Sequence, residues 1–358
     1  MTYPEAMVVG LIQGVTELFP VSSLGHNVLL PALVGGSWAQ DLSVSAPESP
    51  YLAYIVGLHV ATALAMILYF WRDWVRLVLG FVSSVRERRI ATADQRLAWM
   101  IILATIPVGI AGLLLEHAFR VVFSKPVPTA IFLAFNGVIL LGSERLLRRR
   151  PAPVPANTAQ ANTAPASTAQ APQTLVTQLS ATQPLAATPG GAGNARPDDG
   201  WPDPPNQPQA AGGSARDAEI ARAVAADGRL SAMGFGKAVL IGTMQIAALL
   251  PGISRDGIVS VTGMFRGLSR EDAVRFSFLL SAPVILAAGV LKIPDLTGPL
   301  GNGIRGQVLV GSVLSFAGAY FSVRFLTRYF AKQRSMAPFG WYCLAAGTFS
   351  LIFYLVAR

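Results

Sequence analysis

A carboxylate, two hydroxyls and an imidazole lie close together near the start of the chain. The stretch from Gln13 to His26 reads QGVTELFPVSSLGH. Gln13 and Glu17 are four positions apart, so on a helix they share one face. After the proline, Ser22 or Ser23 can cap a new helix, with His26 about one turn further on. Because a helix N-terminus attracts anions, this group of side chains could bind and process an anionic substrate.

Each of these side chains also has a purely structural interpretation. Serines in apolar helices often bond to their own backbone, and a lone histidine is often only a satisfied packing residue. Glu17 is the strongest functional candidate, because a carboxylate in an apolar segment is unfavourable unless it faces a site or a partner.

A second motif, PGISRDG, runs from Pro251 to Gly257. The guanidinium of Arg255 stays protonated and presents a planar fork suited to phosphate. In apolar surroundings it needs an anionic partner. The structural alternative is an ion pair with Glu17 or Asp256.

The composition is that of a membrane protein. Of 358 residues, 52% are hydrophobic and 13% are charged, about half the charge of a soluble domain. The single cysteine, Cys343, excludes a disulfide framework and a cysteine-based metal site. The net charge of +9 does not indicate nucleic acid, because the arginines cluster between apolar runs.

The apolar runs predict an all-α polytopic membrane protein with six spans. Each is long enough to cross a bilayer. The predicted spans are 52–71, 97–115, 127–143, 273–291, 306–326 and 338–356. Two further apolar stretches, 4–33 and 235–265, are interrupted by proline, glycine and serine, which predicts broken re-entrant helical hairpins.

Charge counts predict the orientation. Alternate connecting segments carry 17 and 5 lysines and arginines, so the richer set is expected to be cytoplasmic. The hairpins 4–33 and 235–265 then enter from opposite sides. Gly10-Leu-Ile-Gln13 also resembles Gly242-Thr-Met-Gln245, which predicts an inverted repeat with its site where the hairpins meet.

The apolar runs and their likeness predict that the chain has three parts. Residues 1–150 are the first membrane repeat and 234–358 the second. Between them, 151–233 is expected to be a disordered cytoplasmic linker, because its Pro/Ala-rich sequence has 12 prolines from Pro151 to Pro208. Within it, 216–227 could form a short surface helix.

The two motifs closely resemble the signatures of the undecaprenyl-diphosphate phosphatase family, the bacitracin-resistance proteins. The resemblance covers both halves and skips the linker. It implies that Glu17, Ser23, His26 and Arg255 are catalytic, and that Gln13, Ser22, Gly252, Ser254 and Arg255 bind substrate. Many relatives have glutamate at position 13, and the family pattern has serine at position 256 and threonine at position 259. Here these are Gln13, Asp256 and Val259.

The resemblance implies removal of the terminal phosphate from a C55 isoprenyl diphosphate in a bacterial cell membrane, with the site open to the outer side. The monophosphate serves peptidoglycan synthesis, and its supply confers bacitracin resistance. Ser23 would attack, although His26 could itself be the phosphorylated residue. Glu17 could hold Mg²⁺ or Ca²⁺, and no organic cofactor is expected. The partners are the lipid substrate and the bilayer; a homodimer is allowed.

Three rival interpretations remain. Inverted repeats with broken helices are also a transporter architecture, so the chain could move a polyprenyl phosphate lipid across the membrane. The other lipid phosphatase family has a Lys-x6-Arg-Pro motif that is missing here. A structural scaffold would not need charged side chains in apolar surroundings.

Overall fold

The computed structural model describes residues 1–42, 50–123, 125–149, 215–298 and 303–356. Nearly all of them belong to one compact unit, formed by Met1–Arg150 and Glu219–Arg358. A second unit, Pro151–Ala218, lies almost entirely outside the described residues. Every regular element in the described residues is a helix, as the apolar pattern predicted.

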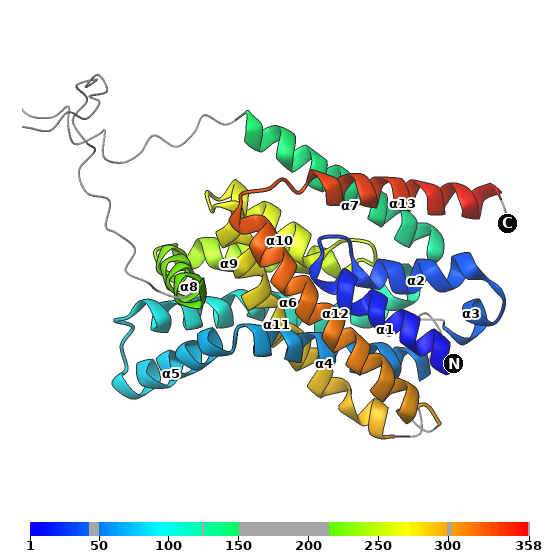
Figure 1. Cartoon of the computed structure of the whole chain (residues 1–358), viewed down its shortest axis with the longest axis horizontal. Coiled ribbons are helices and arrows are strands. Elements are labelled where there is room, and N and C mark those ends of the chain that lie inside the picture. The colour runs from blue at the N-terminus through cyan, green and yellow to red at the C-terminus, as the bar shows by residue number, and fades with distance from the viewer. Residues whose placement is uncertain (43–49, 124, 150–214, 299–302, 357–358) are drawn as a thin grey trace, which may run out of the picture. The chain divides into compact units, whose positions relative to one another are not determined.

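Six long helices correspond to the six predicted spans. They are α4 (Pro50–Tyr69), α6 (Ala93–Phe123), α7 (Pro126–Arg148), α11 (Arg270–Thr297), α12 (Arg305–Ala331) and α13 (Ala337–Val356) (Figure 1). Five of these helices are long and apolar enough by themselves to cross a membrane, and the number rises to seven if bent pairs count as spans. One bent pair joins α4 to the amphipathic helix α5 (Trp71–Glu87) at 86°. The chain is therefore a multi-pass membrane protein.

The two predicted hairpins are sets of short helices, each with a break before its last helix. The first consists of α1 (Tyr3–Leu18) and α2 (Ser23–Val34), followed by the short helix α3 (Gly36–Asp41). The second consists of α9 (Phe235–Thr243), the 3₁₀ helix η2 (Met244–Leu249) and α10 (Arg255–Phe265).

Each hairpin is interrupted where the residue types disfavour a continuous helix. Proline at 20 and at 251 lacks the N–H that would continue each helix. Gly252 has φ +110° and lies against the backbone of Thr129 and Leu133, so a side chain there would be both strained and crowded. Ser22 has φ +67°, a sparsely populated conformation that non-glycine residues adopt where the surroundings enforce it.

The helix contacts follow the predicted repeat. Helix α1 packs on α12, and α9 packs on α6, while α4 contacts α11 and α7 contacts α13. The last pair lies side by side in Figure 1. Glycines at matching positions allow these helices to approach closely. Gly10 of α1 lies against the backbone of Gly311 in α12, and Gly242 of α9 lies against the backbone of Ala104 in α6. The arrangement is thus the same in both halves, with each hairpin held by a span of the other half.

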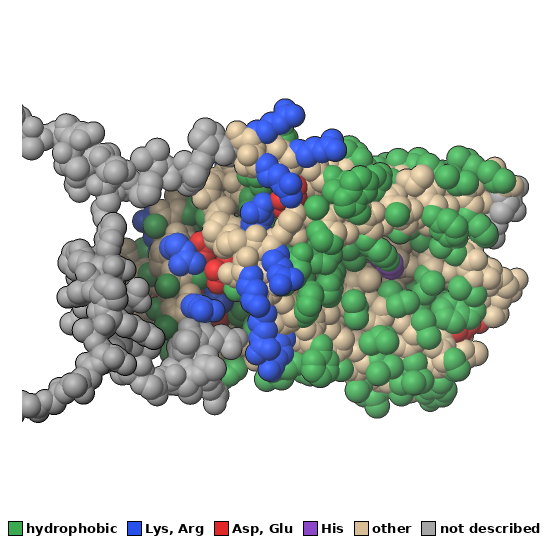
Figure 2. Space-filling model, turned by 45° about the horizontal axis from the view of Figure 1, so that its top comes forward, with side chains coloured by type: hydrophobic (Ala, Val, Ile, Leu, Met, Phe, Trp, Pro, Cys, Tyr) green, Lys and Arg blue, Asp and Glu red, His purple; other side chains and the backbone are tan. Residues whose placement is uncertain are grey.

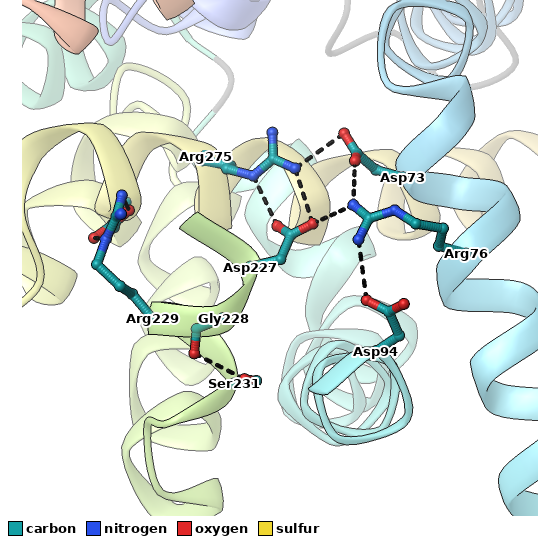
Figure 3. A network of polar contacts seen from close by, with 9 residues as sticks. Asp73, Arg76, Asp94, Asp227, Gly228, Arg229, Ser231 and Arg275 are labelled. Carbon is teal, nitrogen blue, oxygen red and sulfur yellow. Dashed lines mark hydrogen bonds and ion pairs between the residues drawn. The ribbon is translucent and has the colours of Figure 1, made fainter. Parts of the chain in front are cut away.

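The predicted end of the linker is wrong. Helix α8 (Ala215–Ser231) occupies the last part of 151–233, and it is more than a surface helix. Its Asp227 side chain is 2% exposed and accepts from Arg275 and Arg76 (Figure 3). The sequence alone did not reveal these partners, which lie on α11 and α5. Residues 150–214 lie outside the described part.

Charged and apolar surfaces are separated. Figure 2 shows lysine and arginine side chains gathered in a band, with apolar side chains covering the surface to one side of it. Large apolar side chains on α12 and α13 are more than half exposed, among them Phe321, Phe349 and Leu355. An apolar surface of this kind, bordered by positive charge, is typical of contact with lipid.

Candidate active site

A cavity of about 140 Å³ lies where the two hairpins meet. The polar side chains that line it from the first repeat are Glu17, Ser22, Ser23 and His59. Those from the second repeat are Gln245, Ser254 and Arg255. The rest of the lining comes mostly from apolar residues of η2, α6 and α11. The structure therefore brings together five of the predicted site residues, from segments more than 200 positions apart in the sequence.

Glu17 is the centre of the polar network. Its side chain is 4% exposed, and its Oε1 accepts from the guanidinium of Arg255. Its Oε2 accepts from the hydroxyl of Ser23 and, at 2.8 Å, from the amide of Gln13, and lies 3.4 Å from Nε2 of His59. Three donors converge on one carboxylate, with the His59 ring beside them, which compensates for its burial and favours the negative charge.

Ser23 and Ser22 have different surroundings. Ser23 is the first residue of α2, and its hydroxyl donates to Glu17, the geometry of a nucleophile held by a base. Ser22 caps α2, and its oxygen accepts from the backbone N–H of Gly25 at 3.3 Å and of Gly252 at 3.1 Å. Ser23 therefore has the hydroxyl suited to attack phosphorus. Ser22 instead joins the interrupted segments of the two hairpins by hydrogen bonds.

Two helix N-termini begin at the cavity. Ser254 caps α10 by accepting from Gly257 N–H at 3.1 Å, as Ser22 caps α2. Asn136 of α7 joins the two hairpins: its oxygen accepts from the N–H of Ser254 at 3.1 Å, and its NH₂ donates to the carbonyl of Pro20 at 3.0 Å. Because helix N-termini carry partial positive charge, the pair favours an anion between them.

Arg255 pairs with Glu17 and still has a hydrogen-bond donor without a partner among the described residues. Its Nη2 donates to Glu17, while its Nε has no partner among the described residues. Asp256, the other predicted partner, instead accepts from Ser277 and Ser281 of α11, and it does not line the cavity. The aspartate at this motif position therefore adds no carboxylate to the cavity wall.

Three predicted site residues do not line the cavity. His26 bonds through Nδ1 to the carbonyl of Ser22 and through Nε2 to the hydroxyl of Tyr342, both at 2.7 Å. Gln13 is fully buried behind Glu17, and Gly252 is part of the break. In this arrangement His26 supports the turn that carries Ser22, and both of its nitrogens are occupied.

His59 and Gln245 line the cavity but were not among the predicted site residues. His59 lies in α4, and its Nδ1 bonds to the carbonyl of Ile55 at 2.9 Å. A carbonyl only accepts, so Nδ1 carries a proton, and Nε2 needs a second proton to face Glu17 favourably. An ionisable side chain inside the apolar run 52–71 was the signal that could have identified it.

The described residues do not favour a protein-held metal ion. They contain no group of three histidine, cysteine, aspartate or glutamate side chains that could hold one. Both oxygens of Glu17 already accept hydrogen bonds, and the neighbouring guanidinium of Arg255 would repel a cation. The cation predicted on Glu17 stays a prediction.

The fold and the cavity together define a class: a polytopic helical membrane protein whose two repeats each bring a broken helix to one buried, charged site. The family model described as "Bacitracin resistance protein BacA" matches residues 6–190 and 216–349. The chain belongs to this family.

Curated relatives agree over nearly the full length. A Mycolicibacterium paratuberculosis protein named undecaprenyl-diphosphatase is 53% identical over 352 residues, which cover 98% of this chain and 97% of the relative. A Frankia casuarinae protein named undecaprenyl-diphosphatase 1 is 51% identical, with 98% of each chain covered. A Chromobacterium violaceum protein named undecaprenyl-diphosphatase 2 is 34% identical, over 98% of this chain and 99% of the relative.

Proposed function

We propose that this protein hydrolyses undecaprenyl diphosphate to undecaprenyl phosphate and inorganic phosphate. The observation that carries the proposal is the line of contacts in the cavity: the Ser23 hydroxyl donates to Glu17, and Glu17 accepts from Arg255. A nucleophile, a base and a phosphate-binding cation thus lie together between two helix N-termini. The relatives described above supply the class of substrate.

In the first step the terminal phosphate lies against Arg255 and the N-termini of α2 and α10. Ser23 Oγ attacks its phosphorus, and Glu17 takes the hydroxyl proton. The bond from phosphorus to the bridging oxygen breaks, and its electron pair leaves with the lipid monophosphate. Phosphoryl transfer mainly needs charge neutralisation and alignment, and Arg255 and the two helix N-termini offer both.

In the second step water attacks the phosphoserine. The bond between phosphorus and Ser23 Oγ breaks, and the serine recovers the proton held by Glu17. One proton of the water stays on the released phosphate, and the other passes to solvent. Nε2 of His59 lies 3.4 Å from Glu17, so a proton on that nitrogen would stabilise the charged carboxylate of Glu17.

The membrane is that of a bacterial cell, and the cavity opens to its outer side. The support is the excess of lysine and arginine in alternate connecting segments and the positive-inside rule. The monophosphate formed there would return to the cell as a carrier for peptidoglycan synthesis, and its faster supply would oppose bacitracin.

The test is phosphate release by the purified full-length protein in detergent, with C55 diphosphate as substrate. Ser23→Ala should lower turnover by more than about 10³-fold, because it removes the attacking atom. Ser37→Ala, in the exposed part of α3, is the matched control and should keep normal turnover. A protein that only transports lipid releases no phosphate in detergent, and that result would overturn the proposal.

A further inference from the structure

Gln245 is a buried amide that nothing in the described part of the protein satisfies. It lies in η2, is 1% exposed and lines the cavity. Neither its Oε1 nor its Nε2 has a hydrogen-bond partner among the described residues. Buried amides are normally paired, so an unpaired one at a cavity wall indicates a ligand that pairs with it.

The corresponding residue of the first repeat shows why Gln245 is unpaired. Gln13 occupies the matching position, and its amide is fully used: Nε2 donates to Glu17 at 2.8 Å and Oε1 accepts from Asn27 at 2.6 Å. The positions that match these two partners in the second repeat hold apolar side chains. They are Leu249 and Val259.

The chemistry of the amide selects its ligand. Arg255 can only donate, and ionised Glu17 can only accept, whereas an amide does both. In a cavity of about 140 Å³ there is room for a phosphoryl group and a water molecule, since one water fills roughly 30 Å³ in the liquid. An amide that donates to a phosphate oxygen and accepts from a water proton would hold that water against phosphorus.

We propose that Gln245 orients the water that hydrolyses the phosphoserine at Ser23. This inference rests on the proposed function and extends its second step. The water oxygen bonds to phosphorus, Ser23 Oγ leaves with the electron pair, and Glu17 returns its proton to that oxygen. Gln245 gives up no proton of its own; it fixes the position of the water, as phosphoryl-transfer sites require.

The experiment follows the first turnover and the steady state separately. Gln245→Met keeps the length of the side chain and removes its hydrogen bonds. With C55 diphosphate labelled in its terminal phosphate, rapid quenching measures labelled protein, while the lipid monophosphate is measured separately. Gln307→Met, at a glutamine outside the cavity, is the matched control.

For Gln245→Met we expect lipid monophosphate to form at a near-normal rate in the first turnover. Labelled protein should then accumulate, and steady-state phosphate release should fall by about 10²-fold. The melting temperature should not fall, because the variant buries no unpaired amide. The Gln307→Met control should behave as the unmodified protein.

Two results would overturn the inference. One is steady-state release within about threefold of normal. The other is a slow first turnover without labelled protein, which would make Gln245 a substrate-binding group only. Failure of the proposed function is distinguishable, because the unmodified protein would then release no phosphate at all.

Discussion

At the scale of single residues, Glu17 is where polar side chains from four elements meet. Arg255 comes from α10, Ser23 from α2 and His59 from α4, while Gln13 shares α1 with Glu17. Loss of one donor leaves a buried carboxylate less compensated, which affects both turnover and stability. The variants below separate these two effects.

The first prediction concerns Arg255. Arg255→Lys keeps the charge but loses the planar fork, so turnover should fall by roughly 10²–10³-fold with little change in melting temperature. Arg255→Ala leaves Glu17 buried without its cation and should lower stability by about 3–5 kcal/mol. Adding Glu17→Gln should restore stability but not turnover. Near-normal phosphate release by any stable Arg255 variant would contradict the assignment.

The second prediction concerns His59. His59→Leu removes the imidazole that faces Glu17 and should lower phosphate release by about tenfold or more. His59→Gln can still donate to the carboxylate and should recover most of that loss. The measurement is steady-state turnover with melting temperatures for both variants. Equal turnover in the two would show that His59 acts only through packing.

At the scale of elements, each broken helix depends on a close approach to a span of the other half. Ser22 and Asn136 then join the two breaks by hydrogen bonds. The position of the cavity is thus set by helix packing and by these few polar contacts rather than by the hairpins alone.

The third prediction tests this packing with two glycines of α9. A Cβ at Gly242 would overlap the backbone and Cβ of Ala104, whereas Gly236 has open space around it. Gly242→Ala should destabilise the protein by about 1–3 kcal/mol and lower turnover, because the hairpin must move. Gly236→Ala should be neutral or slightly stabilising. Similar melting temperatures for the two variants would refute the close-packing argument.

The fourth prediction concerns the anchor of α8. Asp227 is buried between Arg275 and Arg76 (Figure 3). Asp227→Asn leaves both arginines less compensated and should lower the free energy of unfolding by about 3–5 kcal/mol. The exposed pair of Glu87 and Arg89, with its atoms 3.4 Å apart, is the control. Glu87→Gln should change stability by less than about 1 kcal/mol.

At the scale of the whole molecule, the distribution of charge sets the proposed orientation. The segment 1–51 has no lysine or arginine, whereas 72–96 has six. A band of positive side chains also borders the apolar surface in Figure 2. In the proposed orientation the two hairpins enter from opposite sides.

The fifth prediction tests the orientation. In a Cys343→Ala background, Ser37→Cys in the exposed part of α3 should react with an impermeant thiol reagent in intact cells. Ala91→Cys, in the connection after α5, should react only after lysis. The opposite labelling pattern would reverse the assigned orientation.

The sequence by itself determined the helices and the main chemistry. Spans, breaks and the likeness of the two halves are local patterns of apolar residues, proline and glycine. Glu17 and Arg255 were also predictable, because charged groups in apolar breaks are unfavourable unless they serve a site or a partner, and Ser23 was predicted from the resemblance to the family. The geometry brings these three residues together as predicted.

Only the tertiary structure decided which other side chains reach the cavity. His26 bonds to Tyr342, 316 positions away, and does not line the cavity, so its predicted catalytic role stays a prediction. His59 and Gln245 line the cavity although neither lies in the catalytic part of a motif. Asp256 turns to the serines of α11 instead of the cavity. The physical reason is that spacing fixes which residues share a helix face, whereas the partner of that face is set by packing between segments far apart in the chain.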